Sequence, residues 1–196
     1  MERILIFIKH KISFLWTIID WCNGLFFSIF FKSKMERVLP KVFSDAGNEN
    51  FIFRKLNQTD IQSLYKLITS QPSEDLRYFK PHKFDIGSLE AQIRKPAFLM
   101  MGAFEGERLK GYFFLRFFAN KKCFVGRLID REYRGKGIGL TMNYIMYQTS
   151  WRMGFRCLST ISRNNASVMN AHAKNPTMIV LKELQNDYLL VEFIKK

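Results

Sequence analysis

Acidic residues and cysteines are scarce in this chain of 196 residues, and each shortage excludes a class of protein. Only 17 Asp and Glu stand against 31 Lys and Arg, so the formal net charge is +14. This excess favours an anionic partner such as a phosphorylated small molecule, an anionic lipid or nucleic acid. Cys22, Cys123 and Cys157 are too scattered for a disulfide framework or a zinc motif. We therefore expect a reducing, cytoplasmic setting and no bound metal.

A clean apolar run long enough to be an unambiguous membrane span is also missing. The stretch 12–31 has about the required length, but Asp20 and Asn23 interrupt it. On a helix, the weakly polar residues of this stretch fall on one narrow stripe: Ser13, Thr17, Asp20, Gly24 and Ser28. No small-residue cleavage site follows, so a cleaved signal peptide fits poorly.

Three interpretations of residues 1–34 stay open: a helix lying in the membrane interface, a spanning anchor, or a helix docked on the protein or on a second copy. Either membrane interpretation places the rest of the chain at the cytoplasmic face, because several Lys and Arg follow the apolar stretch. We expect residues 1–34 to form an amphipathic or transmembrane helix that associates with an anionic membrane surface. Residues 35–50, with Pro40 and then SDAGNEN, predict a linker.

Residues 51–196 carry 24 of the 31 Lys and Arg and predict one α/β domain. Alternating or apolar runs predict strands over 51–56, 97–104, 109–118, 123–129, 155–161, 177–182 and 187–194. Helical periodicity and start signals predict helices after Asp60 and over 88–94, 139–153 and 165–174. This order predicts a mixed, mostly antiparallel sheet of about seven strands flanked by helices.

A glycine-rich turn separates one of these strands from the longest helix: Arg134-Gly135-Lys136-Gly137-Ile138-Gly139. Glycine lets the backbone approach a ligand closely, and a helix start presents free N–H groups backed by the helix dipole. The turn therefore predicts a phosphate or pyrophosphate site. It lacks the Gly-Lys-Ser/Thr of nucleotide hydrolases, and the strand before it belongs to a meander rather than to a dinucleotide fold.

Residues 129–139 resemble the acetyl-CoA signature of the GNAT superfamily of N-acetyltransferases, with Arg134, Gly137 and Gly139 at its key positions. The element order over 51–196 is similar to that fold as well. The resemblance implies acetyl-CoA as co-substrate. It implies that the turn holds the pyrophosphate through Arg134, Gly135, Lys136, Gly137, Ile138 and Gly139. It also implies that the backbone of Arg127, Leu128 and Ile129 pairs with the pantetheine arm.

A second motif of this family is an Asn followed about seven residues later by Tyr and then Gly-Phe. Here Asn165 is followed by His172, with Asn164 as an alternative anchor, and 175–177 reads Asn-Pro-Thr. The resemblance implies that Asn164 or Asn165 lies in the cofactor site. The departure leaves the general acid open.

Acetyl transfer needs a deprotonated amine and a proton for the departing thiolate, and histidine suits either role. We expect His172 to act as general acid. His82 lies in an aromatic-x-Pro-His run where this fold places its acceptor loop, so it is a candidate base or acceptor-binding residue. Asp130 could assist the base through water.

These observations predict an acetyl-CoA-dependent N-acetyltransferase that acts on a primary amine, with an amino sugar at the cytoplasmic membrane face as the best acceptor. The alternatives are a protein amino-group acetyltransferase and a catalytically silent GNAT fold used for binding. No nucleic-acid-binding motif is present, so nucleic acid is not the expected partner.

Overall fold

The computed structural model describes residues 13–48, 50–173, 175 and 177–195. Its helices are α2 (Ser13–Phe30), α3 (Lys32–Ala46), α4 (Ile61–Thr69), α5 (Ser73–Leu76), α6 (Ile86–Ile93), α7 (Ile138–Met153) and α8 (Ala166–Ala173). Its strands are β1 (Ile52–Lys55), β2 (Phe98–Glu105), β3 (Arg108–Phe117), β4 (Lys122–Ile129), β5 (Arg156–Ser162), β6 (Met178–Glu183) and β7 (Tyr188–Phe193).

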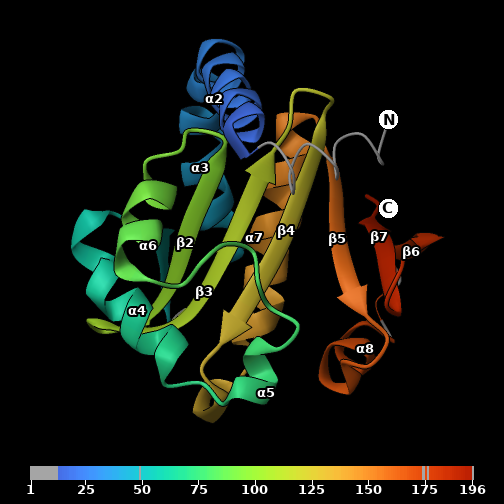
Figure 1. Cartoon of the computed structure of the whole chain (residues 1–196). Helices are drawn as coiled ribbons and strands as arrows, with labels where there is room; N and C mark the ends of the chain where they lie inside the picture. The colour runs from blue at the N-terminus through green and yellow to red at the C-terminus, as the bar shows by residue number, and fades with distance from the viewer. Residues whose placement is uncertain (1–12, 49, 174, 176, 196) are drawn as a thin grey trace.

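In this described part of the chain, seven strands form one sheet in the order β1-β2-β3-β4-β5-β7-β6. Only the β4–β5 pairing in this sheet is parallel, and the others are antiparallel. The predicted mixed, mostly antiparallel sheet is therefore confirmed. Its two faces carry separate apolar layers, with α4 and α6 on one face and α3 and α7 on the other (Figure 1).

The linker predicted over 35–50 is wrong for most of its length, because α3 occupies it as far as Ala46. Met35, Leu39 and Val42 recur at helical spacing and are buried in the core against α7. Pro40 lies inside α3, where it removes one backbone donor, but the burial of this apolar stripe outweighs that loss. Helix α3 thus shares the core of the body.

The helix expected near the N-terminus is present as α2, and it is docked on the protein. Phe27 is buried against Phe117 of β3, with their ring centroids 5.0 Å apart. In the described ranges no helix is both apolar enough and long enough to cross a bilayer. Residues 1–12, which hold the start of the predicted N-terminal segment, lie outside the described part.

Candidate functional site

The divergence of β4 from β5 opens a cleft at one edge of each strand. Their pairing joins Lys122–Phe124 to Arg156–Leu158 and stops there, and Figure 1 shows the two strands separating beyond this point. A strand that loses its neighbour presents backbone N–H and C=O groups that need a partner. The cleft has a volume of about 620 Å³ and is lined by 125–129 of β4 and 159–162 of β5. An extended ligand with amide groups, such as a pantetheine arm, matches this edge.

The glycine-rich turn closes one end of the cleft at the start of α7. Gly135 and Gly137 have φ values of +77° and +79°, a left-handed conformation that favours glycine. Gly137 is the N-cap of α7, so the first N–H groups of this helix point away from the helix and toward the cleft entrance. Gly135, Gly137 and Gly139 all line the cleft. The turn combines close backbone approach with the positive end of the helix dipole, which suits a phosphate group.

Lys136 and Ile138 are the two residues of the turn that do not line the cleft. The Lys136 ammonium lies 4.3 Å from the centre of the Tyr133 ring, in a cation–π contact. Ile138 is buried in the core between α7 and the sheet. The structure therefore gives Ile138 a packing role and places the Lys136 side chain against Tyr133, outside the cleft lining.

Arg134 connects the turn to the short helix α5. Its guanidinium contacts the Asp75 carboxylate at 2.9 Å and 3.1 Å, and its Nε lies 3.4 Å from the carbonyl oxygen of Ile129. Both Arg134 and Asp75 line the cleft, together with Glu74. The sequence did not single out these two carboxylates. The contact links the glycine-rich turn to the segment that carries the expected acceptor loop.

Two polar residues of α7 that line the cleft, Asn143 and Tyr147, were not expected from the sequence. Arg127 of β4 donates a hydrogen bond to Asn143 Oδ1 of α7, and Tyr147 lies one turn further along the same helix. Burial lowers the pKa of Arg127 and raises the pKa of Tyr147. The signal available in the sequence was the spacing of four between Asn143 and Tyr147, which places both residues on one side of α7. Arg127 thus brings a side chain to the cleft as well as a backbone edge.

Helix α8 forms the wall opposite β4. Asn165 caps this helix, because its side-chain oxygen accepts a hydrogen bond from Val168 N at 3.2 Å. Asn164 donates instead to Asp187 at 3.4 Å, and both asparagines line the cleft. His172 lies on α8, but its side chain is outside the described part of the structure.

His82 does not reach the cleft lining. Its Nδ1 lies 2.7 Å from the Lys83 carbonyl oxygen and its Nε2 lies 2.7 Å from the Tyr112 hydroxyl. Because a carbonyl only accepts, the neutral ring carries its proton on Nδ1, and Nε2 accepts from Tyr112. Burial lowers the pKa of His82 below 6.5, although its hydrogen bond to Lys83 partly opposes this. His82 therefore ties the loop after α5 to β3.

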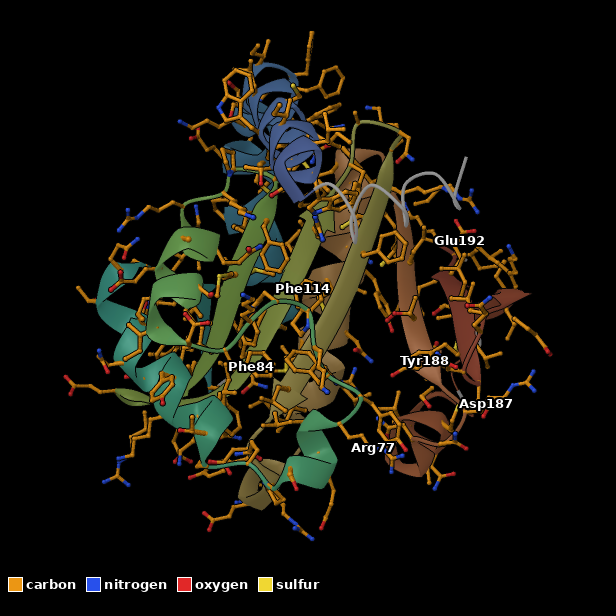
Figure 2. All side chains as sticks on the ribbon, viewed as in Figure 1. Arg77, Phe84, Phe114, Asp187, Tyr188 and Glu192 are labelled. Atoms are coloured by element: carbon orange, nitrogen blue, oxygen red, sulfur yellow. The ribbon has the colours of Figure 1, made fainter. Side chains whose placement is uncertain are left out.

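The loop after α5 brings aromatic residues to the front face of the sheet. Phe79 lines the cleft and contacts Phe114 of β3, with ring centroids 6.2 Å apart. Figure 2 shows Phe114 and Phe84 on the face of the sheet crossed by this loop. Phe79 also contacts the ring of Tyr112, the partner of His82, with ring centroids 6.0 Å apart. The cleft is therefore lined by Tyr78 and Phe79 of this loop and not by His82.

Asp130 follows β4 but is not among the residues that line the cleft. Its carboxylate accepts from Glu132 N at 3.4 Å and lies 3.9 Å from the Lys110 ammonium. Among the described residues, no group of three or more His, Cys, Asp or Glu could hold a metal ion.

No protein-family model matches the sequence, and no curated protein matches it. Solved structures do match. The PaiA N-acetyltransferase of Thermoplasma acidophilum, in complex with coenzyme A, is 21% identical with a TM-score of 0.61, over 72% of this chain and 97% of that one. The GNAT domain of S. lividans PAT is 12% identical with a TM-score of 0.61, over 72% of this chain and 88% of that one.

A third similar structure is an acetyltransferase of Salmonella typhimurium that modifies the N-terminal serine of ribosomal protein L7/L12. It is 16% identical with a TM-score of 0.58, over 74% of this chain and 93% of that one. These similarities, together with the diverging β4 and β5 and the glycine turn, confirm the predicted architecture. The chain has the fold of the GNAT N-acetyltransferases.

Proposed function

We propose that this protein is an acetyl-CoA-dependent N-acetyltransferase that transfers the acetyl group directly to a primary amine. The observation that carries the proposal is the cleft between β4 and β5 that ends on the glycine turn of α7. An open strand edge suits the amides of pantetheine, and the helix start suits the pyrophosphate. The PaiA structure with coenzyme A supports the same assignment.

The proposed donor site uses the residues that line this cleft. The backbone of Arg127, Leu128 and Ile129 would hold the pantetheine arm, and Gly135, Gly137 and Gly139 would let the pyrophosphate approach α7. Arg134, held by its ion pair with Asp75, would fix the turn at the mouth of the cleft. Asn165 would act indirectly, since it fixes the start of α8.

The thioester supplies an activated acetyl group, and the protein must manage two protons. The acceptor nitrogen attacks the carbonyl carbon, the C–S bond breaks, the nitrogen loses one proton and the sulfur gains one. We propose His172, on the helix that walls the cleft, as the donor of the second proton. Asp130 lies beyond the end of the cleft, so water would have to connect it to the amine.

For His82 we propose a positioning role on the acceptor side. Its hydrogen bonds to Tyr112 and to Lys83 hold the loop that carries Phe79. Glu74 adds a carboxylate to this side of the cleft beside the Arg134–Asp75 ion pair, which suits an approaching ammonium group. Tyr78 and Phe79 offer flat apolar faces, which favour a ring-bearing acceptor such as an amino sugar.

We also propose that the acceptor is met at the cytoplasmic face of an anionic membrane, with residues 1–34 providing the association. Lys9, Lys11, Lys32 and Lys34 around the apolar stretch support this proposal. A protein amino group is the second candidate acceptor, and the L7/L12 acetyltransferase supports it.

The test is a turnover measurement with the full chain. Release of CoA from acetyl-CoA would be followed with amino sugars, nucleotide-linked amino sugars and peptides with free N-termini, and mass spectrometry would identify the acetylated product. We expect turnover with at least one amine. CoA binding without turnover on any of them would favour a silent binding module, and failure to bind CoA would refute the proposal.

A further inference from the structure

Helix α2 docks with polar side chains facing the protein. The Asp20 carboxylate accepts hydrogen bonds from Lys95 at 2.6 Å and from Arg116 at 3.1 Å. Asn23 donates to the backbone oxygen of Phe117 at 2.8 Å and accepts from Ala119 N at 2.9 Å. Burial alone would raise the pKa of Asp20, but its two cationic partners outweigh burial and hold that pKa below its usual range. The carboxylate is therefore charged and anchors the helix.

This orientation turns the apolar side of α2 outward. We define the outer apolar face of α2 as Ile18, Ile19, Trp21, Leu25, Ile29 and Phe30, all exposed. Trp21 and Ile29 are each 66% exposed and Phe30 is 62% exposed. A helix on a soluble surface normally shows the reverse arrangement, with its apolar side turned inward. Six exposed apolar side chains on one helix indicate an apolar partner.

A hollow of about 490 Å³ adjoins this face, between α2 and the turn that follows α6. Trp16 and Trp21 line it from α2, and three cations line it from the body: Arg94, Lys95 and Arg116. Asp20 is the one carboxylate among its lining residues, so the hollow carries a net positive charge. The Arg116 guanidinium also lies 6.0 Å from the centre of the Trp16 ring.

Together these features match the boundary of an anionic bilayer. The outer face holds apolar side chains suited to acyl chains, and the cations beside it lie where lipid phosphates would be. Tryptophan is enriched at this boundary, because its ring is apolar and its N–H is polar. A second copy of the chain is a poorer occupant, since each copy carries +14 and the hollow is positive.

We propose that the hollow beside α2 binds the phosphate headgroup of an anionic phospholipid while the outer apolar face enters the interface. This inference rests on the proposed membrane association and adds a headgroup site to it. Figure 1 shows α2 at the end of the sheet where the β3–β4 hairpin lies, whereas β4 runs away from that hairpin toward the glycine turn. Lipid contact at α2 would thus leave the cofactor turn accessible from solution.

The test compares binding of the full chain to phosphatidylcholine vesicles and to vesicles that also contain phosphatidylglycerol, by flotation. We expect clear preference for the anionic vesicles. Arg94→Glu reverses a charge in the hollow and should weaken binding to anionic vesicles about tenfold while leaving the weak binding to neutral vesicles unchanged. Ile29→Glu should abolish binding to both.

The matched control is Val180→Glu, because Val180 is 53% exposed on β6 and is not part of α2 or the hollow. It should bind vesicles as the wild type does. Circular dichroism and CoA binding of each variant would show that the fold is retained.

The outcomes separate this inference from the proposals on which it rests. Equal binding of the wild type to neutral and anionic vesicles would overturn the headgroup site and leave membrane association standing. Binding to neither vesicle would overturn both. A dimer in sedimentation that Ile29→Glu dissociates would make a second copy the occupant and would also overturn the inference. The turnover measurement tests the enzymatic proposal separately, and its result does not depend on vesicle binding or dimer formation.

Discussion

Glycine at position 137 can be required because its backbone is left-handed or because a ligand passes close to it. The substitutions Gly137→Ala and Gly137→Asn separate these two reasons. The residue has φ +79° and ψ −15°, and a Cβ added there would meet no protein atom within 4 Å. Replacement by Ala therefore causes no internal clash. Its cost to folding comes from the left-handed backbone, about 1–2 kcal/mol for a residue with a Cβ. For a chain of this size that corresponds to a fall in Tm of roughly 2–8 °C.

Asn tolerates the left-handed conformation better than Ala, because its short polar side chain bonds locally. Gly137→Asn should therefore keep a Tm close to that of the wild type. Its side chain would nevertheless occupy the space above the turn into which we expect the pyrophosphate to fit. We expect the Kd for CoA to rise at least tenfold, about 1.4 kcal/mol, in isothermal titration.

The matched control is Gly106→Asn. Gly106 has φ +57° in the turn between β2 and β3, and a Cβ there also meets no protein atom within 4 Å. Gly106 is not among the residues that line the cleft. The Gly106→Asn variant should lower the Tm as little as Gly137→Asn does, and it should leave the affinity for CoA unchanged. Wild-type affinity in a folded Gly137→Asn variant would refute the idea that the ligand approaches this backbone.

Three other predictions concern protons and charges. His172→Ala should lower kcat by roughly 10²-fold with little change in the affinity for acetyl-CoA; unchanged kinetics would remove this residue from the mechanism. The lowered pKa of His82 means that protonation opposes its folded contact with Tyr112, so the wild type should lose stability as pH falls below 6.5. His82→Gln should flatten that loss in urea titrations at pH 7 and pH 5, and an identical loss in both proteins would contradict the assignment. The Arg54 hydrogen bonds lower the pKa of Asp60, so this pair stabilises the fold above pH 4 and its contribution disappears as pH falls further. Asp60→Asn should cost about 1.5 kcal/mol at pH 7 and almost nothing at pH 2, and a cost independent of pH would exclude the ion pair as its cause.

Local signals in the sequence determined the architecture of the body. Strand alternation and turn residues predicted all seven strands within about two residues. The central strands β2 to β5 and β7 bury one side or both, whereas β6 is exposed over nearly its whole length and was predicted from its apolar residues and flanking turns. The glycine turn predicted the start of α7 and an anion site there, since backbone conformation and helix polarity depend on neighbouring residues alone. Asn165 was one of two candidate anchors, and the structure makes it the cap of α8.

The tertiary structure decided what depends on residues distant in sequence. Asp20 looked like an interruption of an apolar helix, but its partners Lys95 and Arg116 lie 75 and 96 positions away and turn the polar stripe inward. His82 lay in the expected acceptor loop, yet Tyr112, 30 positions on, holds it outside the set of residues that line the cleft. Sequence periodicity predicts which residues share one side of a helix or strand. It does not predict which distant residues that side contacts, because those contacts form only when the chain packs. The segment that forms α3 was predicted to be a linker for the same reason. Its apolar stripe is buried only because α7 packs against it.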